Sequence, residues 1–162
     1  MSKGELLHRR KGTRKERKSG FKEPRANSYL IITEGECTEP YYFQGLADKI
    51  RESIGGNVDI SAVPLIDVDG KGCSTTRLVE EAEKKVKEAK ILYQNVWVVF
   101  DKDEFIDFDD AIKLCKKKGY KAAWSNQCFE YWIYLHFEYS DSAIHRKEWK
   151  DKLVKELMGY MR

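Results

Sequence analysis

The chain has 162 residues, of which 41% are hydrophobic and 12% aromatic, enough for one folded domain with a core. No apolar run approaches the roughly 20 residues of a membrane-spanning helix, and no secretory signal follows the N-terminus, so we expect a cytoplasmic protein without a membrane partner. The four cysteines are widely spaced and form no C-x-x-C pair, which predicts free thiols rather than a zinc site.

The net charge of +3 conceals an uneven distribution. Residues 1–25 contain ten Lys or Arg and three Glu, whereas the rest of the chain contains more acidic than basic residues. A basic segment suits a partner with phosphates, because each Lys or Arg that neutralises a phosphate releases counterions. A solubilising leader would have the same composition, and both interpretations stay open. We expect residues 1–26 to form a flexible basic arm and residues 27–162 to form the folded domain.

Strands and helices alternate along that domain. The β-rich run 28–33 predicts a strand, and Thr38, Glu39 and Pro40 suit the first turn of a helix that continues to Ile50 with one apolar face. Further along the chain we expect strands at 58–66, 96–100 and 120–124, helices at 75–92, 105–118 and 127–137, and a last helix from about His145 onward.

This βα alternation predicts the fold class. It favours a four-stranded, mainly parallel sheet with helices on both faces, that is, a Rossmann-like α/β fold. The strand at 96–100 (VWVVF) is apolar on both sides, as a central parallel strand covered by helices should be.

Acidic residues follow two of the predicted strands. Glu34 comes after the first strand, and Asp101 and Asp103 come after the third. Ligands of open α/β sheets bind at the carboxyl ends of the strands. Carboxylates held close together repel one another unless a cation lies between them, and hard oxygen ligands suit Mg²⁺ or Mn²⁺. We therefore predict that Glu34, Asp101 and Asp103 share a metal site; unrelated acids in two loops are the alternative.

Two further acids lie in predicted first helical turns. Glu39 is either an additional metal ligand or an acid favoured by the helix dipole, and the two interpretations are equally open. Glu130, in the helix at 127–137, is a possible additional acid with the same alternative. In that helix Phe129, Trp132 and His136 share one face, which predicts core residues.

Phosphate contacts are predicted at several basic residues. The loop 67–74 contains Gly-Lys-Gly but lacks Ser or Thr directly after Lys71, so it is not a Walker loop. Its glycines, Lys71 and the following helix could hold a phosphate on backbone N–H groups, or the loop is an ordinary βα connection. The other candidate contacts are Lys102 and, in the arm, Arg9, Arg10, Arg14 and Lys15.

Three segments, taken together, resemble the RloB family: 31–43 (IITEGECTEPYYF), 98–103 (VVFDKD) and 125–137, with SNQCFEYW followed by LHF. The resemblance covers roughly residues 28–162. It implies a Toprim-like domain, related to that of OLD-type nucleases, in which Glu34, Asp101 and Asp103 coordinate Mg²⁺ and Glu39 stands at the position of a second acid. Family members are associated with phage defence, often beside an ATPase, so the resemblance also implies an ATPase partner. They usually continue past the final helix, so we expect a natural short form or a chain truncated at its C-terminus.

The resulting functional hypothesis is a Mg²⁺- or Mn²⁺-dependent nuclease, with Glu34, Asp101 and Asp103 as catalytic residues and DNA or RNA as substrate. The alternative is a non-catalytic metal- and nucleic-acid-binding sensor subunit of an ATPase-containing defence complex. A phosphoacceptor receiver domain would need a lysine after a fifth strand, which we do not find. The sequence leaves open the choice between DNA and RNA, activity in isolation, the oligomeric state and the trigger.

Overall fold

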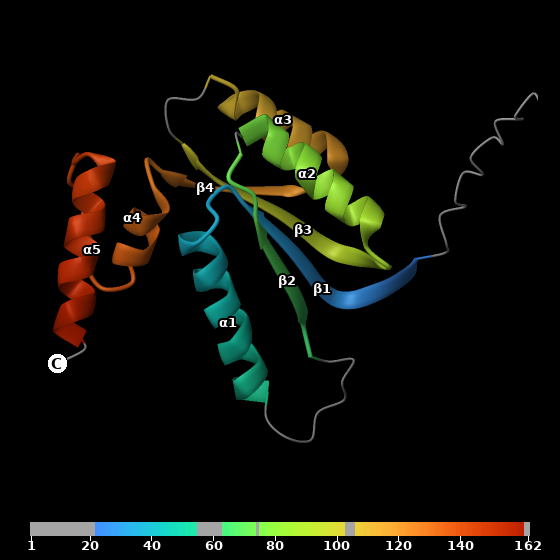
Figure 1. The fold of residues 1–162 in the computed structure, drawn as a ribbon, viewed down its shortest axis with the longest axis horizontal. Coiled ribbons are helices and arrows are strands. Elements are labelled where there is room, and N and C mark those ends of the chain that lie inside the picture. Colours follow the sequence, from blue (N-terminus) through green and yellow to red (C-terminus); the bar gives the residue numbers. More distant parts are fainter. Residues whose placement is uncertain (1–21, 55–62, 74, 103–105, 161–162) are drawn as a thin grey trace, which may run out of the picture.

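The computed structural model describes residues 22–54, 63–73, 75–102 and 106–160. In chain order its elements are β1 (Glu23–Thr33), α1 (Thr38–Ile54), β2 (Leu65–Gly70), α2 (Thr75–Glu88), β3 (Ile91–Lys102), α3 (Phe108–Lys118), β4 (Lys121–Asn126), α4 (Phe129–Tyr134) and α5 (Arg146–Tyr160) (Figure 1).

The four strands form one parallel sheet in the order β2-β1-β3-β4. The chain steps from β1 to β2 in one direction across the sheet, and from β2 to β3 and β4 in the other. Right-handed crossovers therefore place α1 on one face and α2 and α3 on the opposite face, as Figure 1 shows. The predicted four-stranded parallel sheet with helices on both faces is confirmed.

The main core lies between the sheet and the pair α2 and α3. Alternate residues of β1 and β3 point to this side because side chains of a strand alternate between the faces. A second, smaller cluster packs α4 against α5 through Cys128, Tyr134, Trp149 and Leu153. The main core consists of Leu30, Ile32, Leu78, Val79, Ala82, Val96, Val98, Phe100, Ala111 and Cys115.

The first strand begins earlier than predicted. Glu23 to Arg25 pair with Ile91 to Tyr93, so the last residues of the expected arm, 23–26, belong to the sheet. Two charged residues and a proline, Glu23, Arg25 and Pro24, conceal the strand in the sequence. The register shifts between Arg25 and Tyr29, where Asn27 adopts a φ of 55°. Residues 1–21 of the arm lie outside the described residues.

The second strand lies later than predicted. It spans Leu65–Gly70 instead of 58–66, and residues 58–62 lie outside the described part of the chain. Its two acids, expected in a loop, have partners along this edge strand. Tyr93 donates a hydrogen bond to Asp67, and Asp69 forms ion pairs with Lys71 at 2.9 Å and Lys85 at 2.6 Å. Because both carboxylates have partners, Asp67 and Asp69 can lie in a strand although they are polar.

Two helices are shorter than predicted because neighbouring strands are longer. The helix expected to reach 92 ends at Glu88, since Ile91 begins β3. The helix expected from 105 begins at Phe108, and residues 103–105 lie outside the described residues.

The region around α4 corrects a predicted helix start and a predicted core face. The helix expected from 127 begins only at Phe129, after Gln127 turns the chain with a φ of 68°, and Ser125 and Asn126 are the last residues of β4. Trp132 is 46% exposed, and the hydrogen bond between His136 and Tyr42 is exposed as well. The buried residues of α4 are Phe129 and Tyr134, because α5 covers the Tyr134 side.

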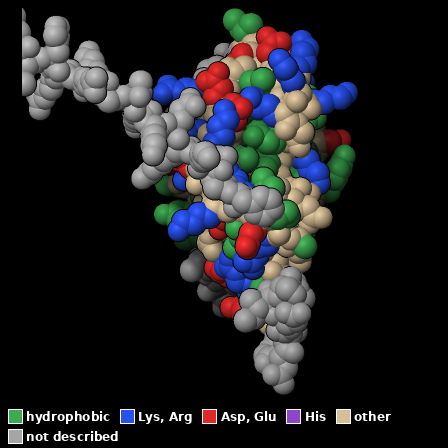
Figure 2. Space-filling model, turned by 90° about the vertical axis from the view of Figure 1, so that its right-hand side faces the viewer, with side chains coloured by type: hydrophobic (Ala, Val, Ile, Leu, Met, Phe, Trp, Pro, Cys, Tyr) green, Lys and Arg blue, Asp and Glu red, His purple; other side chains and the backbone are tan. Residues whose placement is uncertain are grey.

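Described charged residues of both signs are scattered over the face shown in Figure 2. Among the helices that the structure describes, none has the length and apolar character needed to cross a membrane.

Candidate functional site

Glu34 and Asp101 lie side by side where β1 and β3 end. The backbone N–H of Glu34 donates to the carbonyl of Val99 at 2.9 Å, which holds the residue after β1 against β3. The side-chain Oε2 of Glu34 in turn accepts a hydrogen bond from the backbone N–H of Asp101 at 3.2 Å. Parallel pairing of the two central strands thus brings together two acids that are distant in the sequence.

Asp101 is the carboxylate of this region whose pKa is shifted to about 6 by its surroundings. Its side chain is 13% exposed, the Ser125 hydroxyl donates to Oδ1 at 2.5 Å, and Nη2 of Arg146 lies 3.8 Å from Oδ2. Burial, reinforced by the negative charges of Glu39 and Glu130, raises the pKa of Asp101 to about 6 although Ser125 and Arg146 oppose the shift. Deprotonated Asp101 is therefore held at an energetic cost.

Glu39, in the first turn of α1, packs against Gly35. Only 7% of Glu39 is exposed, and a Cβ atom at Gly35 would lie 2.0 Å from its Oε2. Burial and the charge of Glu130 raise the pKa of Glu39, while hydrogen bonds from the backbone N–H groups of Glu39 and Gly35 lower it. Glycine at position 35 thus leaves the space in which this carboxylate lies.

The loop after β2 supports the loop that carries Glu34. The backbone N–H of Lys71 donates to the carbonyl of Thr33 at 3.1 Å, and that of Gly72 to the carbonyl of Glu34 at 2.8 Å. Gly72 has a φ of +57° and contacts the side chain of Glu36. These two N–H groups are engaged by the protein itself, so they are not available to a phosphate.

The acids open onto one hollow of about 380 Å³, here called the acidic hollow. Four carboxylates reach it from β1, α1, β3 and α4, together with the guanidinium group of Arg146 from α5. Burial is the largest cause of the raised pKa values of Glu39 and Asp101, and repulsion between the acids of the hollow adds to it. The lining residues are Glu34, Gly35, Thr38, Glu39, Gly72, Cys73, Asp101, Glu130 and Arg146.

The donor chemistry of the acidic hollow fits a hard divalent cation, since carboxylate oxygens are the ligands that Mg²⁺ and Mn²⁺ prefer and a cation would relieve the repulsion. Within the described residues, no three carboxylates, thiols or imidazoles lie close enough together to hold a metal ion. Asp103, the third predicted ligand, lies outside those residues. A complete ligand set would therefore need Asp103 or a movement of the acids that line the hollow.

The predicted phosphate contacts do not line the acidic hollow where they are described. Lys71 is paired with Asp69 at 2.9 Å, and the Nζ of Lys102 lies 5.6 Å from the centroid of the Phe108 ring. The four candidates of the arm, Arg9, Arg10, Arg14 and Lys15, lie outside the described residues.

Sequence reasoning missed Arg146 and the role of Ser125. Arg146 is the first residue of α5 and reaches Asp101 only because α4 and α5 pack together, so no local pattern indicates it. Ser125 could have been found by extending β4 by two residues, which places it opposite Asp101 in the strand register.

Fold and hollow define the class: a Rossmann-like α/β protein with an acidic site at the carboxyl edge of a parallel sheet. A family model described as RloB-like protein matches residues 29–162, which is most of the chain. The chain belongs to the RloB-like family. No curated protein and no solved structure matches it.

Proposed function

We propose that the chain is a Mg²⁺-dependent nuclease of the RloB/Toprim type that hydrolyses phosphodiester bonds of DNA or RNA in anti-phage defence. The observation that supports this function is the convergence of Glu34, Glu39, Asp101 and Glu130 on one hollow at the carboxyl edge of the sheet. Acids alone would repel a phosphate, so the arrangement suits a phosphodiester only together with a cation.

Glu34, Asp101 and Asp103 would hold the metal, with Glu39 as a further ligand. Bound Mg²⁺ lowers the pKa of a coordinated water and stabilises negative charge on the attacked phosphate. Ser125 and the backbone N–H of Asp101 keep two of the carboxylates oriented before substrate binds. Arg146, half exposed beside Asp101, is placed to contact phosphate oxygens.

A cleavage assay tests this proposal. Single- and double-stranded DNA and RNA are incubated with the protein in Mg²⁺, in Mn²⁺ and in EDTA, alone and together with any candidate ATPase encoded nearby. We expect metal-dependent cleavage that Glu34→Gln and Asp101→Asn each reduce by about 10²–10³-fold, the usual cost of losing one transition-state contact. Glu52→Gln, which changes an exposed acid of α1, is the matched control and should cleave like wild type. Absence of cleavage under all these conditions contradicts the proposal.

The second candidate is a metal- or nucleic-acid-binding subunit that senses its ligand for an ATPase without cutting it. The observation that favours it is the Arg146 guanidinium group 3.8 Å from Asp101, because a cation of the protein itself can contact a phosphate without cutting the strand. This function predicts Mn²⁺ or nucleic-acid binding without cleavage, and a change of ATPase rate that Glu34→Gln abolishes.

A further inference from the structure

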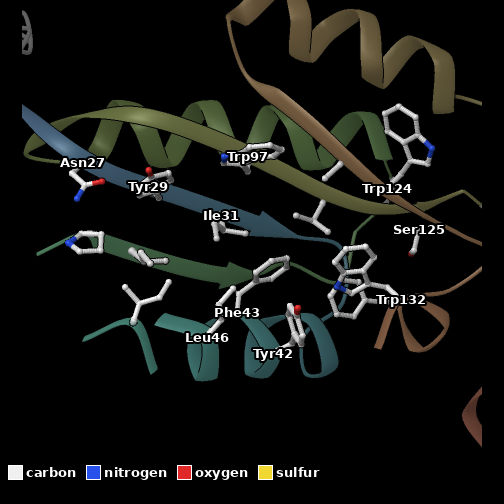
Figure 3. Close-up of a pocket in the computed structure, with 16 residues that line it drawn as sticks. Asn27, Tyr29, Ile31, Tyr42, Phe43, Leu46, Trp97, Trp124, Ser125 and Trp132 are labelled. Carbon is white, nitrogen blue, oxygen red and sulfur yellow. The ribbon is translucent and has the colours of Figure 1, made fainter. Parts of the chain in front are cut away.

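A second cavity, of about 580 Å³ and lined almost entirely by apolar groups, lies on the α1 face of the sheet (Figure 3). Ile31 of β1 and Trp97 and Val99 of β3 form its floor, and Phe43 of α1 and Trp132 of α4 form its walls. The cavity exists because α1 packs on β1 and β2 while α4 reaches only β4, which leaves part of this face open between the two helices. We call it the aromatic cavity.

The aromatic cavity adjoins the acidic hollow. Ser125 lines the cavity and donates its hydrogen bond to Asp101 in the hollow. Phe129 lines the cavity, and the next residue, Glu130, lines the hollow. On α1 the same change from an acid to an apolar lining residue occurs over four residues, about 6 Å of helix rise, between Glu39 and Phe43. One ligand can therefore extend from the acids into the cavity.

The lining of the aromatic cavity suits a flat aromatic group. Figure 3 shows Tyr42, Phe43 and Trp132 gathered at the end near Ser125, with Trp97 on the sheet. Aromatic side chains stack on nucleobases of any sequence because each base has a π face. At the Trp97 side, the Nζ of Lys121 lies 5.0 Å from the ring centroid and adds a positive charge that suits a phosphate backbone.

Resting on the proposed function, we propose that the aromatic cavity binds an unpaired nucleobase of the strand whose phosphate lies at the acidic hollow. A base inside a duplex is stacked and paired and cannot enter such a cavity without leaving the helix. The preferred substrate is therefore single-stranded nucleic acid or an unpaired segment. Trp132, which is 46% exposed and contacts His136 edge-on, stands at the end of the cavity nearest the acids, where it can stack on the base.

Binding of labelled oligonucleotides tests the proposal independently of cleavage. Fluorescence anisotropy is measured in Ca²⁺ and in EDTA for a short single strand, its duplex, and single strands with one abasic position moved along them. We expect the single strand to bind at least tenfold tighter than the duplex, and one abasic position to weaken binding by about tenfold, the typical effect of losing one stacked base. Trp132→Ala should weaken the intact strand to a similar degree and leave the abasic strand unchanged.

Controls separate this inference from the nuclease proposal. Tyr139→Ala removes an aromatic side chain that is 80% exposed and does not line the cavity, so it should bind like wild type, and Trp132→Phe should restore stacking. Four results would each overturn the inference. The duplex and the single strand bind equally well, or an abasic position has no effect wherever it stands in the strand. Alternatively, neither Trp132→Ala nor Trp97→Ala changes binding, or a free mononucleotide binds as tightly as the strand. If cleavage occurs despite one of these results, the nuclease proposal stands and only the base site fails. If base-dependent binding occurs without cleavage, the base site stands and the nuclease proposal fails.

Discussion

Ser125 and Asp101 face each other across β3 and β4, and the Ser125 hydroxyl hydrogen-bonds the Asp101 carboxylate at 2.5 Å. Ser125 also lines the aromatic cavity, so at this point one side chain contacts both the acids of the hollow and the apolar lining of the cavity. Together with the nearby charge of Arg146, this hydrogen bond stabilises the charged form of a carboxylate that burial and two neighbouring acids disfavour.

Removing this hydrogen bond should weaken metal binding. Ser125→Ala deletes an interaction that lowers the pKa of Asp101, so the pKa rises further and Asp101 is protonated over a wider pH range. We expect Mn²⁺ affinity to fall by about 10–100-fold at pH 7, the usual cost of losing a group that orients a ligand, with partial recovery at higher pH. Titration of Mn²⁺ by electron paramagnetic resonance across pH 6–9 measures both effects. Ser53→Ala, which changes an exposed hydroxyl of α1, is the control; unchanged Mn²⁺ affinity in Ser125→Ala would contradict the assigned role.

Replacing Asp101 should stabilise the metal-free protein at neutral pH. The pKa of Asp101 is raised to about 6 in the folded chain, from a usual 3.8, so the folded state binds the proton more tightly than the unfolded state. Stability of the wild type therefore falls as the pH rises from about 4 to 6. Asp101→Asn removes this cost and keeps an oxygen for Ser125.

We expect Asp101→Asn to raise the free energy of unfolding in EDTA by about 1–3 kcal/mol at pH 8, and the gain to vanish near pH 4. Urea unfolding at both pH values measures it. A variant that is no more stable than wild type at pH 8 would show that the charged carboxylate is fully compensated.

A side chain at Gly35 should displace the Glu39 carboxylate. A Cβ atom there would overlap the Glu39 carboxylate at 2.0 Å. Gly35→Ala should therefore lose about 1–3 kcal/mol of stability, the usual cost of overpacking, and weaken Mn²⁺ binding as Glu39 moves.

Gly45→Ala is the matched control for this substitution. Gly45 is exposed in α1, with nothing within 4 Å of its added Cβ, so alanine should stabilise the protein by about 0.5–1 kcal/mol. Thermal unfolding compares the two variants. Equal effects of both substitutions would refute the packing argument at Gly35.

The four free cysteines should differ in reactivity. Cys37 is exposed, whereas Cys115 and Cys128 are buried, and burial raises the pKa of Cys115 to about 11 and also raises that of Cys128. Since the thiolate is the reactive form, 5,5′-dithiobis(2-nitrobenzoate) should modify Cys37 within minutes at pH 8 and the two buried thiols only on unfolding. Absorbance kinetics with and without urea, and mass mapping of the modified peptides, check this. Modification of native Cys115 as fast as Cys37 would contradict its burial.

The alternation of strands and helices was predictable because apolar periodicity is a local property of the chain. Element ends were less predictable where tertiary contacts override local composition. Glu23 to Arg25 join β1 because Ile91 to Tyr93 offer a parallel partner, and Ser125 and Asn126 extend β4 because Asp101 and Lys102 pair with them. On α4, Phe129 is buried as predicted, but Trp132 and His136 are exposed, because the packing of α5 decides which side of that short helix is covered.

The sequence by itself determined that acids follow the first and third strands, since residue type and strand order are written in the chain. The tertiary structure decided which groups meet. It placed Glu39 over Gly35, brought Ser125 and Arg146 to Asp101, and left an aromatic cavity next to them. The physical reason is that these contacts arise from strand register and helix packing between segments far apart in the chain, where desolvation and charge repulsion act only once the segments are packed together.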